Sequence, residues 1–327
     1  MHWLILEQLA DGELHSGETI ARRLGVSRTA VWKAFNKLEQ FDLLVEHQRG
    51  VGYRLAGAAL DLLDAHQIRQ AMPGISVGKG ENLSALRLFK EIPSTNQYLL
   101  DEEIGHAAGP VACLAEYQHA GRGRRGRNWY SPFGANLYCS LAWPVRSSAA
   151  DLSGLSLAVG VTVAELLSAM QVPGIGLKWP NDLLVDGQKL GGILIDLRGE
   201  ANGVIWAVVG VGINVNMQAG DGQTIDQPWT SCQQLIAKPL SRNQLAGQLI
   251  DRLISAMTCF EQQGFAAFSQ RWHQLDLLVG KPVWVEQGGE KMAALAAGVD
   301  ASGALRVSSN GSSFVLHSGE VSVRAAD

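Results

Sequence analysis

The chain of 327 residues has only four cysteines, and no two of them form a C-x-x-C pair. Their wide spacing fits neither a disulfide framework nor a cysteine metal site, so each is predicted to be a small buried apolar residue. No run reaches the ~18 consecutive apolar residues of a membrane helix. The N-terminus shows no basic region followed by an apolar leader. These absences predict a reduced, cytoplasmic protein that does not associate with membranes.

An excess of charge of one sign is also missing. The 27 Lys and Arg residues nearly balance the 31 Asp and Glu residues, which argues against binding nucleic acid through bulk charge. The hydrophobic fraction of 46% is that of a globular protein, and the length predicts two or three domains. The average conceals two basic segments, because residues 22–37 carry five basic and no acidic residues and residues 119–131 carry four arginines.

The first basic segment has the pattern helix, tight turn, helix. Residues 19–24 predict a short helix, Gly25 a left-handed helix end, and Ser27 the N-cap of a second helix. The second helix has an apolar face at helical spacing and an opposite polar face. With the end of the first helix, this polar face supplies the candidate DNA-binding residues Arg22, Arg23, Arg28, Thr29, Trp32, Lys33, Asn36 and Lys37. Such side chains read base edges and bind phosphates.

Two strand-like runs follow, at residues 43–46 and 51–55, with a turn at 47–50. Residues 1–62 are therefore interpreted as a winged helix-turn-helix DNA-binding domain, with a plain helical scaffold as the alternative. Residues 63–84 are predicted to be a linker, with a connecting helix at 60–72. One such module reads few base pairs, so specific binding would need a dimer.

From residue 85 onward, strands and helices alternate, and several strands follow one another directly. This order predicts an α+β fold with a mixed sheet and helices on one side, rather than a doubly wound sheet. The segment Gly121–Arg127 contains the letters of G-x-G-x-x-G, but it runs into Pro132 and Gly134 instead of a helix. A dinucleotide-binding fold is therefore excluded.

Four arginines in this glycine-containing loop can bind phosphate or carboxylate groups, because guanidinium groups do so bidentately and glycine lets the backbone approach closely. A nucleic-acid arm or a basic linker is the alternative. Three further segments stand near predicted strand ends: 94–96 (Ser-Thr-Asn), 178–182 (Lys-Trp-Pro-Asn-Asp) and 189–194 (Lys-Leu-Gly-Gly-Ile-Leu).

With these motifs in this order, the chain resembles the biotin–protein ligases, and specifically those that also repress the biotin operon. The resemblance covers essentially the whole chain. It implies a class II synthetase-like catalytic domain at residues 85–272 and an SH3-like β-barrel at 273–327. A lipoate-type ligase and a small-molecule-sensing transcription factor without catalysis remain as alternatives.

The resemblance implies a biotin–[acetyl-CoA-carboxylase] ligase that uses ATP and Mg²⁺ to convert biotin to biotinyl-5′-AMP. It then transfers biotin to a lysine of the biotin carboxyl carrier protein of acetyl-CoA carboxylase. In this family, the adenylate is also the corepressor, which favours a homodimer that binds operator DNA of the biotin genes.

Residue roles are implied in the same way. The catalytic residues are Lys189, which bridges the biotin carboxylate and the α-phosphate, Arg124, which holds the adenylate, and Asp182, which activates the acceptor lysine or associates with Mg²⁺. The biotin-binding residues are Ser94, Thr95, Asn96, Gln118, Gly121, Arg122, Arg124, Lys189, Gly191, Gly192 and Ile193. The nucleotide-binding residues are Arg122, Arg124, Arg127, Trp129, Asn181, Lys189 and Asn214. Residues 217–240 are expected to hold an adenylate-proximal loop, with Trp229 as a candidate contact.

Overall fold

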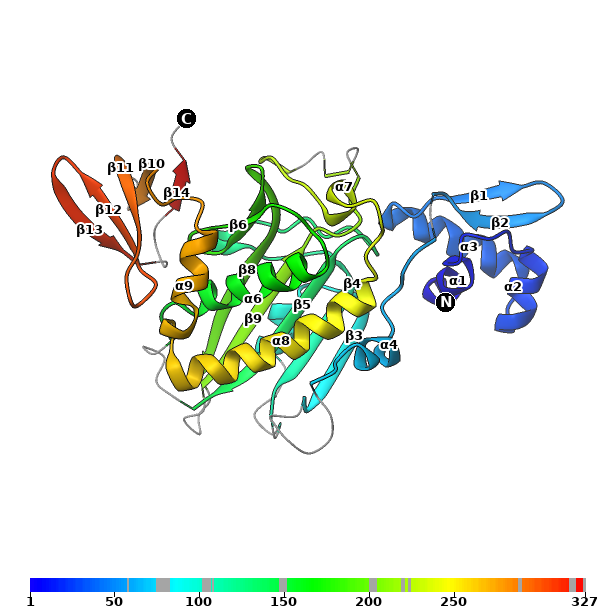
Figure 1. The fold of residues 1–327 in the computed structure, drawn as a ribbon. Coiled ribbons are helices and arrows are strands. Elements are labelled where there is room, and N and C mark those ends of the chain that lie inside the picture. Colours follow the sequence, from blue (N-terminus) through cyan, green and yellow to red (C-terminus); the bar gives the residue numbers. More distant parts are fainter. Residues whose placement is uncertain are drawn as a thin grey trace.

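The computed structural model describes residues 1–57, 59–74, 83–101, 107, 109–146, 152–199, 205–218, 221–222, 225–287, 290–317 and 322–325. A small helical module and a C-terminal sheet lie at opposite ends of a central domain built around a large sheet (Figure 1). Among the described residues, no helix is both long and apolar enough to cross a membrane.

The N-terminal module contains α1 (His2–Leu9), α2 (Gly17–Leu24), α3 (Arg28–Leu38) and the short 3-10 helix η1 (Glu39–Phe41). Gly25 has a φ of 64°, and Ser27 Oγ accepts a hydrogen bond of 3.1 Å from the Ala30 N–H, so the predicted turn and cap are confirmed. The antiparallel hairpin β1 (Val45–Gln48) and β2 (Gly52–Leu55) follows. The first strand begins two residues later than expected, because its pairing starts at Val45 opposite Leu55.

The connecting helix is shorter than the sequence predicts. Instead of spanning 60–72, α4 covers Ala65–Gln70, because the Asp64 carboxylate accepts hydrogen bonds from two N–H groups of its first turn. The preceding residues 60–64 are extended and are bound to the central domain. The linker residues 75–82 and Ala58 lie outside the described residues.

The central sheet has the strand order β3-β4-β5-β9-β8-β7-β6. Its strands are β3 (Ala85–Ile92), β4 (Val111–Gln118), β5 (Leu137–Val145), β6 (Ile175–Lys178), β7 (Asp182–Val185), β8 (Gln188–Gly199) and β9 (Ile205–Ile213). Only β3 and β4 pair in parallel, and the other neighbours are antiparallel. The predicted mixed α+β sheet is therefore confirmed.

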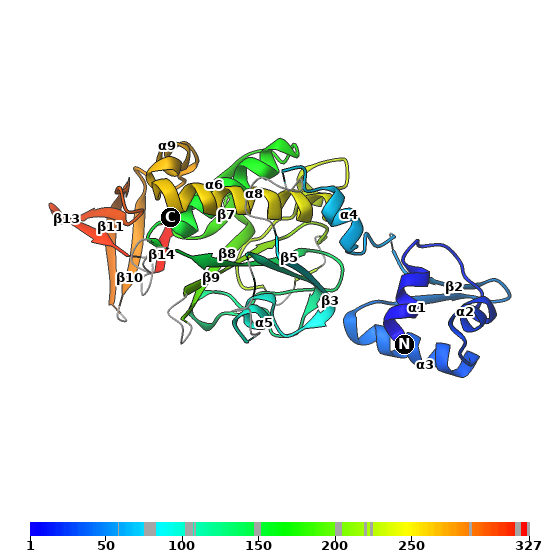
Figure 2. The same ribbon diagram turned by 90° about the horizontal axis from the view of Figure 1, so that it is seen from below.

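Three helices cover one face of this sheet: α6 (Leu155–Ala169), α8 (Arg242–Gln263) and α9 (Ala266–Leu275). The helix α5 (Thr95–Asp101) lies on the opposite face (Figure 2). The expectation that the helices lie on one side is wrong for α5, since both faces of β4 are apolar. Leu114 packs into the α6–α8 core, whereas Cys113 packs into the cluster that includes Leu99 of α5.

The C-terminal region forms a five-stranded antiparallel sheet of order β13-β12-β11-β10-β14. Its strands are β10 (Pro282–Gln287), β11 (Glu290–Val299), β12 (Leu305–Ser309), β13 (Ser312–Leu316) and β14 (Ser322–Ala325). The expected turn at Asn310-Gly311 is confirmed by their φ angles of 51° and 78°. In the described part of the chain, β13 and β14 do not pair with each other, so closure into an SH3-like barrel stays a prediction. The expected glycine pair at 288–289 lies outside the described residues.

A fully buried ion pair ties the connector to the central domain. Arg242 at the start of α8 donates from Nη2 to Glu116 of β4 at 2.6 Å, and the other Glu116 oxygen accepts the Leu63 N–H at 2.6 Å. Arg242 also donates to the backbone carbonyls of Asp61 and Asn136. Neither charge is in contact with water, so their mutual satisfaction matters more than the attraction itself.

Removing one charge of this pair should be costly. For Glu116→Gln, we expect a loss of about 3–5 kcal/mol in the free energy of unfolding, because Arg242 would stay buried without a counter-charge. The measurement is urea unfolding followed by far-UV circular dichroism. The control is Glu165→Gln, which removes the partly exposed pair with Arg271 and should cost less than about 1 kcal/mol. Equal losses for the two variants would contradict this interpretation.

Candidate active site and DNA-facing helix

A cavity of about 780 Å³ opens where β4, β8 and β9 meet the arginine-containing loop. Most of the predicted ligand-binding residues line it: Ser94, Thr95, Asn96, Gln118, Gly121, Arg122, Arg124, Arg127, Trp129, Asn181, Lys189, Gly192, Ile193 and Asn214. Asp182 instead lines an adjoining cavity of about 320 Å³, together with the arginines of the loop. The predicted residue Gly191 lines neither, because it faces the Gly212 carbonyl of β9.

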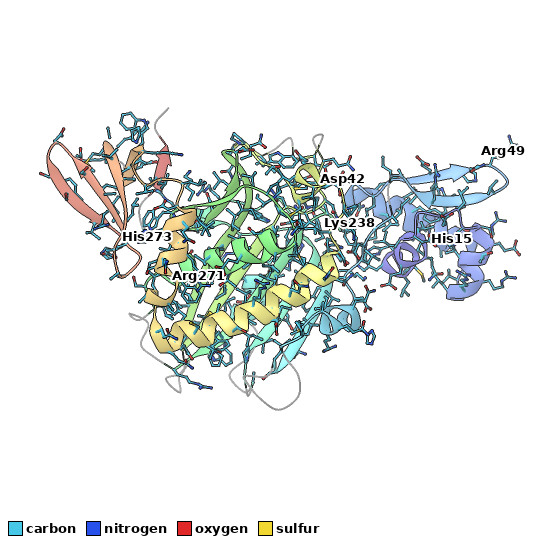
Figure 3. All side chains as sticks on the ribbon, in the orientation of Figure 1. His15, Asp42, Arg49, Lys238, Arg271 and His273 are labelled. Carbon is cyan, nitrogen blue, oxygen red and sulfur yellow. The ribbon has the colours of Figure 1, made fainter. Side chains whose placement is uncertain are left out.

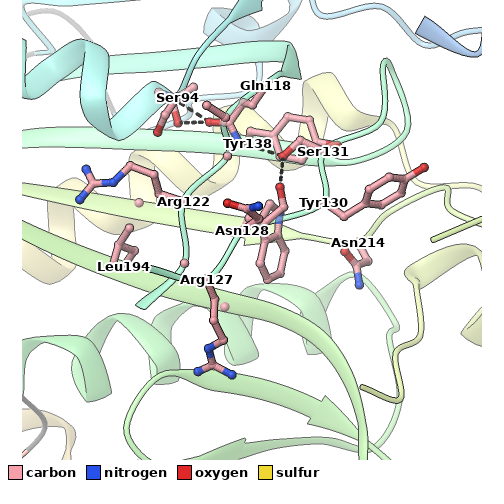
Figure 4. Close-up of a pocket in the computed structure, with 18 of the residues that line it drawn as sticks. Ser94, Gln118, Arg122, Arg127, Asn128, Tyr130, Ser131, Tyr138, Leu194 and Asn214 are labelled. Atoms are coloured by element: carbon pink, nitrogen blue, oxygen red, sulfur yellow. Dashed lines mark hydrogen bonds between the residues drawn. The ribbon is translucent and has the colours of Figure 1, made fainter. Parts of the chain in front are cut away.

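A chain of polar side chains forms one end of the larger cavity (Figure 4). Thr95, at the start of α5, donates its N–H to Gln118 Oε1 at 2.8 Å. Gln118 Nε2 then donates to Ser131 Oγ at 3.1 Å, and Ser131 Oγ donates to the Trp129 carbonyl at 2.9 Å. These bonds fix the side chains in place, so this end can offer oriented donors and acceptors to a small polar ring.

The neighbouring pair Asn96 and Arg122 is held by one carboxylate. Asn96 Nδ2 donates to Asp196 Oδ2 at 3.0 Å, and Arg122 Nη1 donates to the same oxygen at 3.2 Å. The Cβ of an alanine at position 210 would lie 2.2 Å from Asn96 Oδ1, so only glycine fits there. The sheet therefore presses Asn96 into a single position beside the cavity.

The Trp129 ring lies flat against two glycines of the sheet. A Cβ at Gly212 would come within 2.7 Å of the indole, and one at Gly192 within 3.3 Å. The described residues provide no hydrogen-bond partner for the buried Trp129 Nε1. A ligand group that accepts a hydrogen bond would satisfy this nitrogen.

Positive charge gathers beside this ring. Lys189 Nζ lies 5.6 Å from the Trp129 ring centroid and 2.8 Å from Asp182 Oδ1. Arg124 Nη1 donates to Asn181 Oδ1 at 3.2 Å. Burial lowers the pKa of Arg124, the nearby Arg127 lowers it further, and Asp182 opposes the shift. An anionic ligand at this place would replace the missing counter-charges.

Asn214 contacts the cavity but has a mainly structural role. Its Nδ2 donates to the carbonyls of Lys189 at 3.2 Å and Thr230 at 3.0 Å. The segment at Trp229 pairs with Lys189, since the Lys189 N–H donates to the Pro228 carbonyl at 2.9 Å. The expected loop of residues 217–240 thus reaches the cavity, although the helix α7 (Cys232–Leu235) within it was not predicted.

Five lining residues outside the predicted site sets belong to the loop and to the N-terminal module: Gln40, Phe41, Asp42, Tyr130 and Ser131. Tyr130 and Ser131 directly follow Trp129, and this adjacency was a usable signal. The three N-terminal residues carry no sequence signal of this kind, because they reach the cavity only through the packing of two modules.

The second candidate site is the outer face of the helical module. All eight predicted DNA-binding residues are exposed, and the apolar face of α3 is buried against α1 and α2. Trp32 is 57% exposed, which is unusual for so large an apolar side chain without a binding role. Figure 3 places Arg49 at the tip of the β1–β2 hairpin, far from the central domain. This face and the tip are free to approach a duplex.

Known proteins share both sites. Residues 88–214 match the biotin/lipoate A/B protein ligase family, and residues 4–54 match a helix-turn-helix domain. The chain is 39% identical over 323 residues to the bifunctional ligase/repressor BirA of Salmonella typhimurium and to that of Escherichia coli. In both cases the match covers 99% of this chain and 97% of the relative. The chain belongs to the biotin–protein ligase family.

The ligase is of the bifunctional ligase/repressor type, because the match extends over the helix-turn-helix module as well as the catalytic domain. A biotin protein ligase from Aquifex aeolicus in complex with biotin and ATP is a similar solved structure. Its TM-score is 0.64 at 26% identity, and the match covers 75% of this chain and 100% of that one.

The buried thiol in the cavity wall leads to a test of the site's packing. Burial raises the pKa of Cys139 to about 12, so almost none of it is thiolate at pH 8. We expect a thiol reagent at pH 8 to modify the partly exposed Cys259 and to leave Cys139 unmodified, as read by peptide mass spectrometry. Full labelling in urea is the control. Modification of native Cys139 as fast as Cys259 would show that the cavity wall is open.

Proposed function

We propose that the larger cavity binds biotin and ATP and joins them into biotinyl-5′-AMP. The smaller cavity admits a lysine of the biotin carboxyl carrier protein of acetyl-CoA carboxylase. The observation that carries this proposal is that Lys189, Arg124 and Arg127 line both cavities, next to the ordered polar end at Gln118. The printed complex of the Aquifex aeolicus relative with biotin and ATP supports it.

The chemistry requires two anions to meet. The biotin carboxylate attacks the α-phosphorus, the bond to the bridging oxygen breaks, and pyrophosphate leaves. Lys189, placed between the biotin and nucleotide ends, lowers the repulsion and stabilises the charge of the transition state. Arg124 and Arg127 then hold the phosphate of the adenylate. The remaining members of the biotin-binding and nucleotide-binding sets orient the two substrates.

In the second step, the acceptor amine attacks the acyl carbon and AMP leaves. Asp182, in the smaller cavity, is suited to take a proton from the approaching ammonium group. The arginine loop closes over the adenylate and keeps water from hydrolysing it. The empty loop carries four like charges, and a bound phosphate removes their repulsion.

Magnesium fits this site only as an ion shared with the nucleotide. The described residues contain no group of three or more side chains that could ligate a metal. Asp182 would therefore contribute one oxygen, and the phosphates and water would supply the rest. The ion would neutralise phosphate charge during attack.

The remaining proposals concern the molecule as a whole. We assign domain limits at residues 1–62, 63–84, 85–272 and 273–327, with α9 crossing the last limit. The C-terminal sheet closes into an SH3-like barrel, and the protein works in the cytoplasm.

The ligase activity is tested with ATP, Mg²⁺, a carrier domain, and either biotin or lipoate. We expect a mass increase of the carrier with biotin alone, and a loss of about 10²–10³-fold in rate for Lys189→Ala, the scale for removing a preorganised donor. Lys238→Ala, an exposed lysine outside both cavities, is the control. Modification by lipoate alone would assign the other branch of the family, and an unmodified carrier would remove the enzyme activity.

The helix-turn-helix module supports a repressor function with biotinyl-5′-AMP as the corepressor. We propose that adenylate-bound chains form a homodimer that binds operator DNA of the biotin genes, with α3 in the major groove and the β1–β2 hairpin as the wing.

Salt dependence tests the DNA contact. If each protomer neutralises about three phosphates, the slope of log association constant against log salt concentration should be about −5. Lys33→Ala should reduce this slope by about one unit per lost contact in each protomer, whereas Lys281→Ala in the C-terminal region should not change it. A slope near zero, or no footprint with the adenylate present, would contradict the repressor function.

A further inference from the structure

Three residues of the helix-turn-helix module form part of the catalytic cavity. Gln40, Phe41 and Asp42 line the cavity that also contains Lys189 and Trp129. They come from η1 and the residue after it, where Asp42 turns the chain with a left-handed φ of 59°. Figure 3 shows Asp42 on the side of the module that faces the central domain.

Aromatic packing holds this corner in place. The Phe41 ring lies 5.2 Å from Tyr117, edge to face, and 6.3 Å from Phe133. Trp3 of α1 stacks on Phe133 at 5.0 Å. Phe133 belongs to the same buried cluster as the core of the helical module. The corner is therefore docked on a continuous apolar contact.

The docked residues touch the backbone that carries the ligand-binding side chains. Tyr117 immediately precedes Gln118, and Phe133 follows Ser131 by two residues. The same short segments thus support the ordered polar end on one side and the helical module on the other.

Charges divide the cavity into two ends. Burial raises the pKa of Tyr130, and the carboxylates of Asp42 and Asp221 raise it further, so these acids lie around the phenol. In Figure 4, the Tyr130 phenol points away from Arg122 and Arg127. Phosphates belong with the arginines, and a carboxylate would repel them. The end at Asp42 instead suits the uncharged nucleoside, whose hydroxyl and amino groups donate hydrogen bonds.

We propose that Asp42 and Phe41 of the helix-turn-helix module belong to the nucleoside-binding part of the catalytic cavity. Asp42 accepts a hydrogen bond from a ribose hydroxyl or from the base amino group, and Phe41 supplies an apolar wall beside Tyr130. This inference rests on the proposed use of ATP. It makes the DNA-binding module a part of the enzyme's substrate site.

ATP binding to the full chain, measured by titration calorimetry, tests the inference without requiring catalysis. For Asp42→Gly, we expect the dissociation constant of ATP to rise by about tenfold, the usual effect of losing a hydrogen bond to a charged group. Glycine tolerates the left-handed backbone at this position, so the fold is kept. Phe41→Leu, which keeps an apolar side chain, should weaken ATP binding by a smaller factor.

The matched control is Glu13→Gln, which removes one exposed carboxylate from the same module, outside the cavity lining. It should leave ATP binding unchanged. Biotin binding should be unchanged in all variants, whereas a module that merely undocked would weaken biotin and ATP together through Gln118.

Nucleotide analogues identify the bonded group. The wild-type chain should bind 2′-deoxy-ATP, 3′-deoxy-ATP or inosine triphosphate about tenfold more weakly than ATP, and Asp42→Gly should not discriminate against that same analogue. Unchanged ATP binding in Asp42→Gly, or discrimination that survives the substitution for every analogue, would overturn the inference. A wild-type chain that binds ATP but does not biotinylate the carrier would overturn the proposed function alone.

Discussion

The contact between Trp129 and the glycines at positions 192 and 212 determines how the rest of the site is built. Because these two positions have no side chain, the indole can lie directly on β8 and β9. The Trp129 N–H bonds to the Gly121 carbonyl at 2.9 Å, so the same residue pins the arginine loop to the sheet. Its carbonyl in turn receives Ser131 Oγ, which links the loop to Gln118. One planar side chain on a glycine floor therefore aligns the loop, the polar end and Lys189.

The near-neutral composition of the chain conceals a separation of charge that explains both proposed functions. Positive side chains are concentrated on the outer face of α3 and along the arginine loop, and each group is suited to a phosphate-bearing ligand. Within the cavity, the separation continues, with arginines at one end and carboxylates near Tyr130. The molecule thus distinguishes phosphate from nucleoside by position, while the buried Glu116–Arg242 pair holds the connector between the modules.

Local patterns in the sequence predicted local structure well. The helix-turn-helix, with Gly25 and Ser27 at its turn, depends on neighbouring residues only, and so did the strands that carry Gln118 and Lys189. The helix expected at 60–72 failed because residues 61–64 are held by side chains of α8, nearly 180 residues away in the chain. The opposite-face position of α5 and the approach of Asp42 to the cavity were equally invisible, since both depend on how separate elements pack. The ligand-binding sets came from motif order and resemblance, and the structure brings nearly all of them around one cavity.

The central claim is that an arginine loop pinned by Trp129 closes over an acyl-adenylate. Hydrogen exchange of residues 119–130, measured with and without biotin and ATP, tests it most directly. The account predicts that backbone amides of this segment exchange markedly more slowly when both substrates are present, with little change in the distant C-terminal sheet. Equal exchange of the loop in the two states would contradict the account.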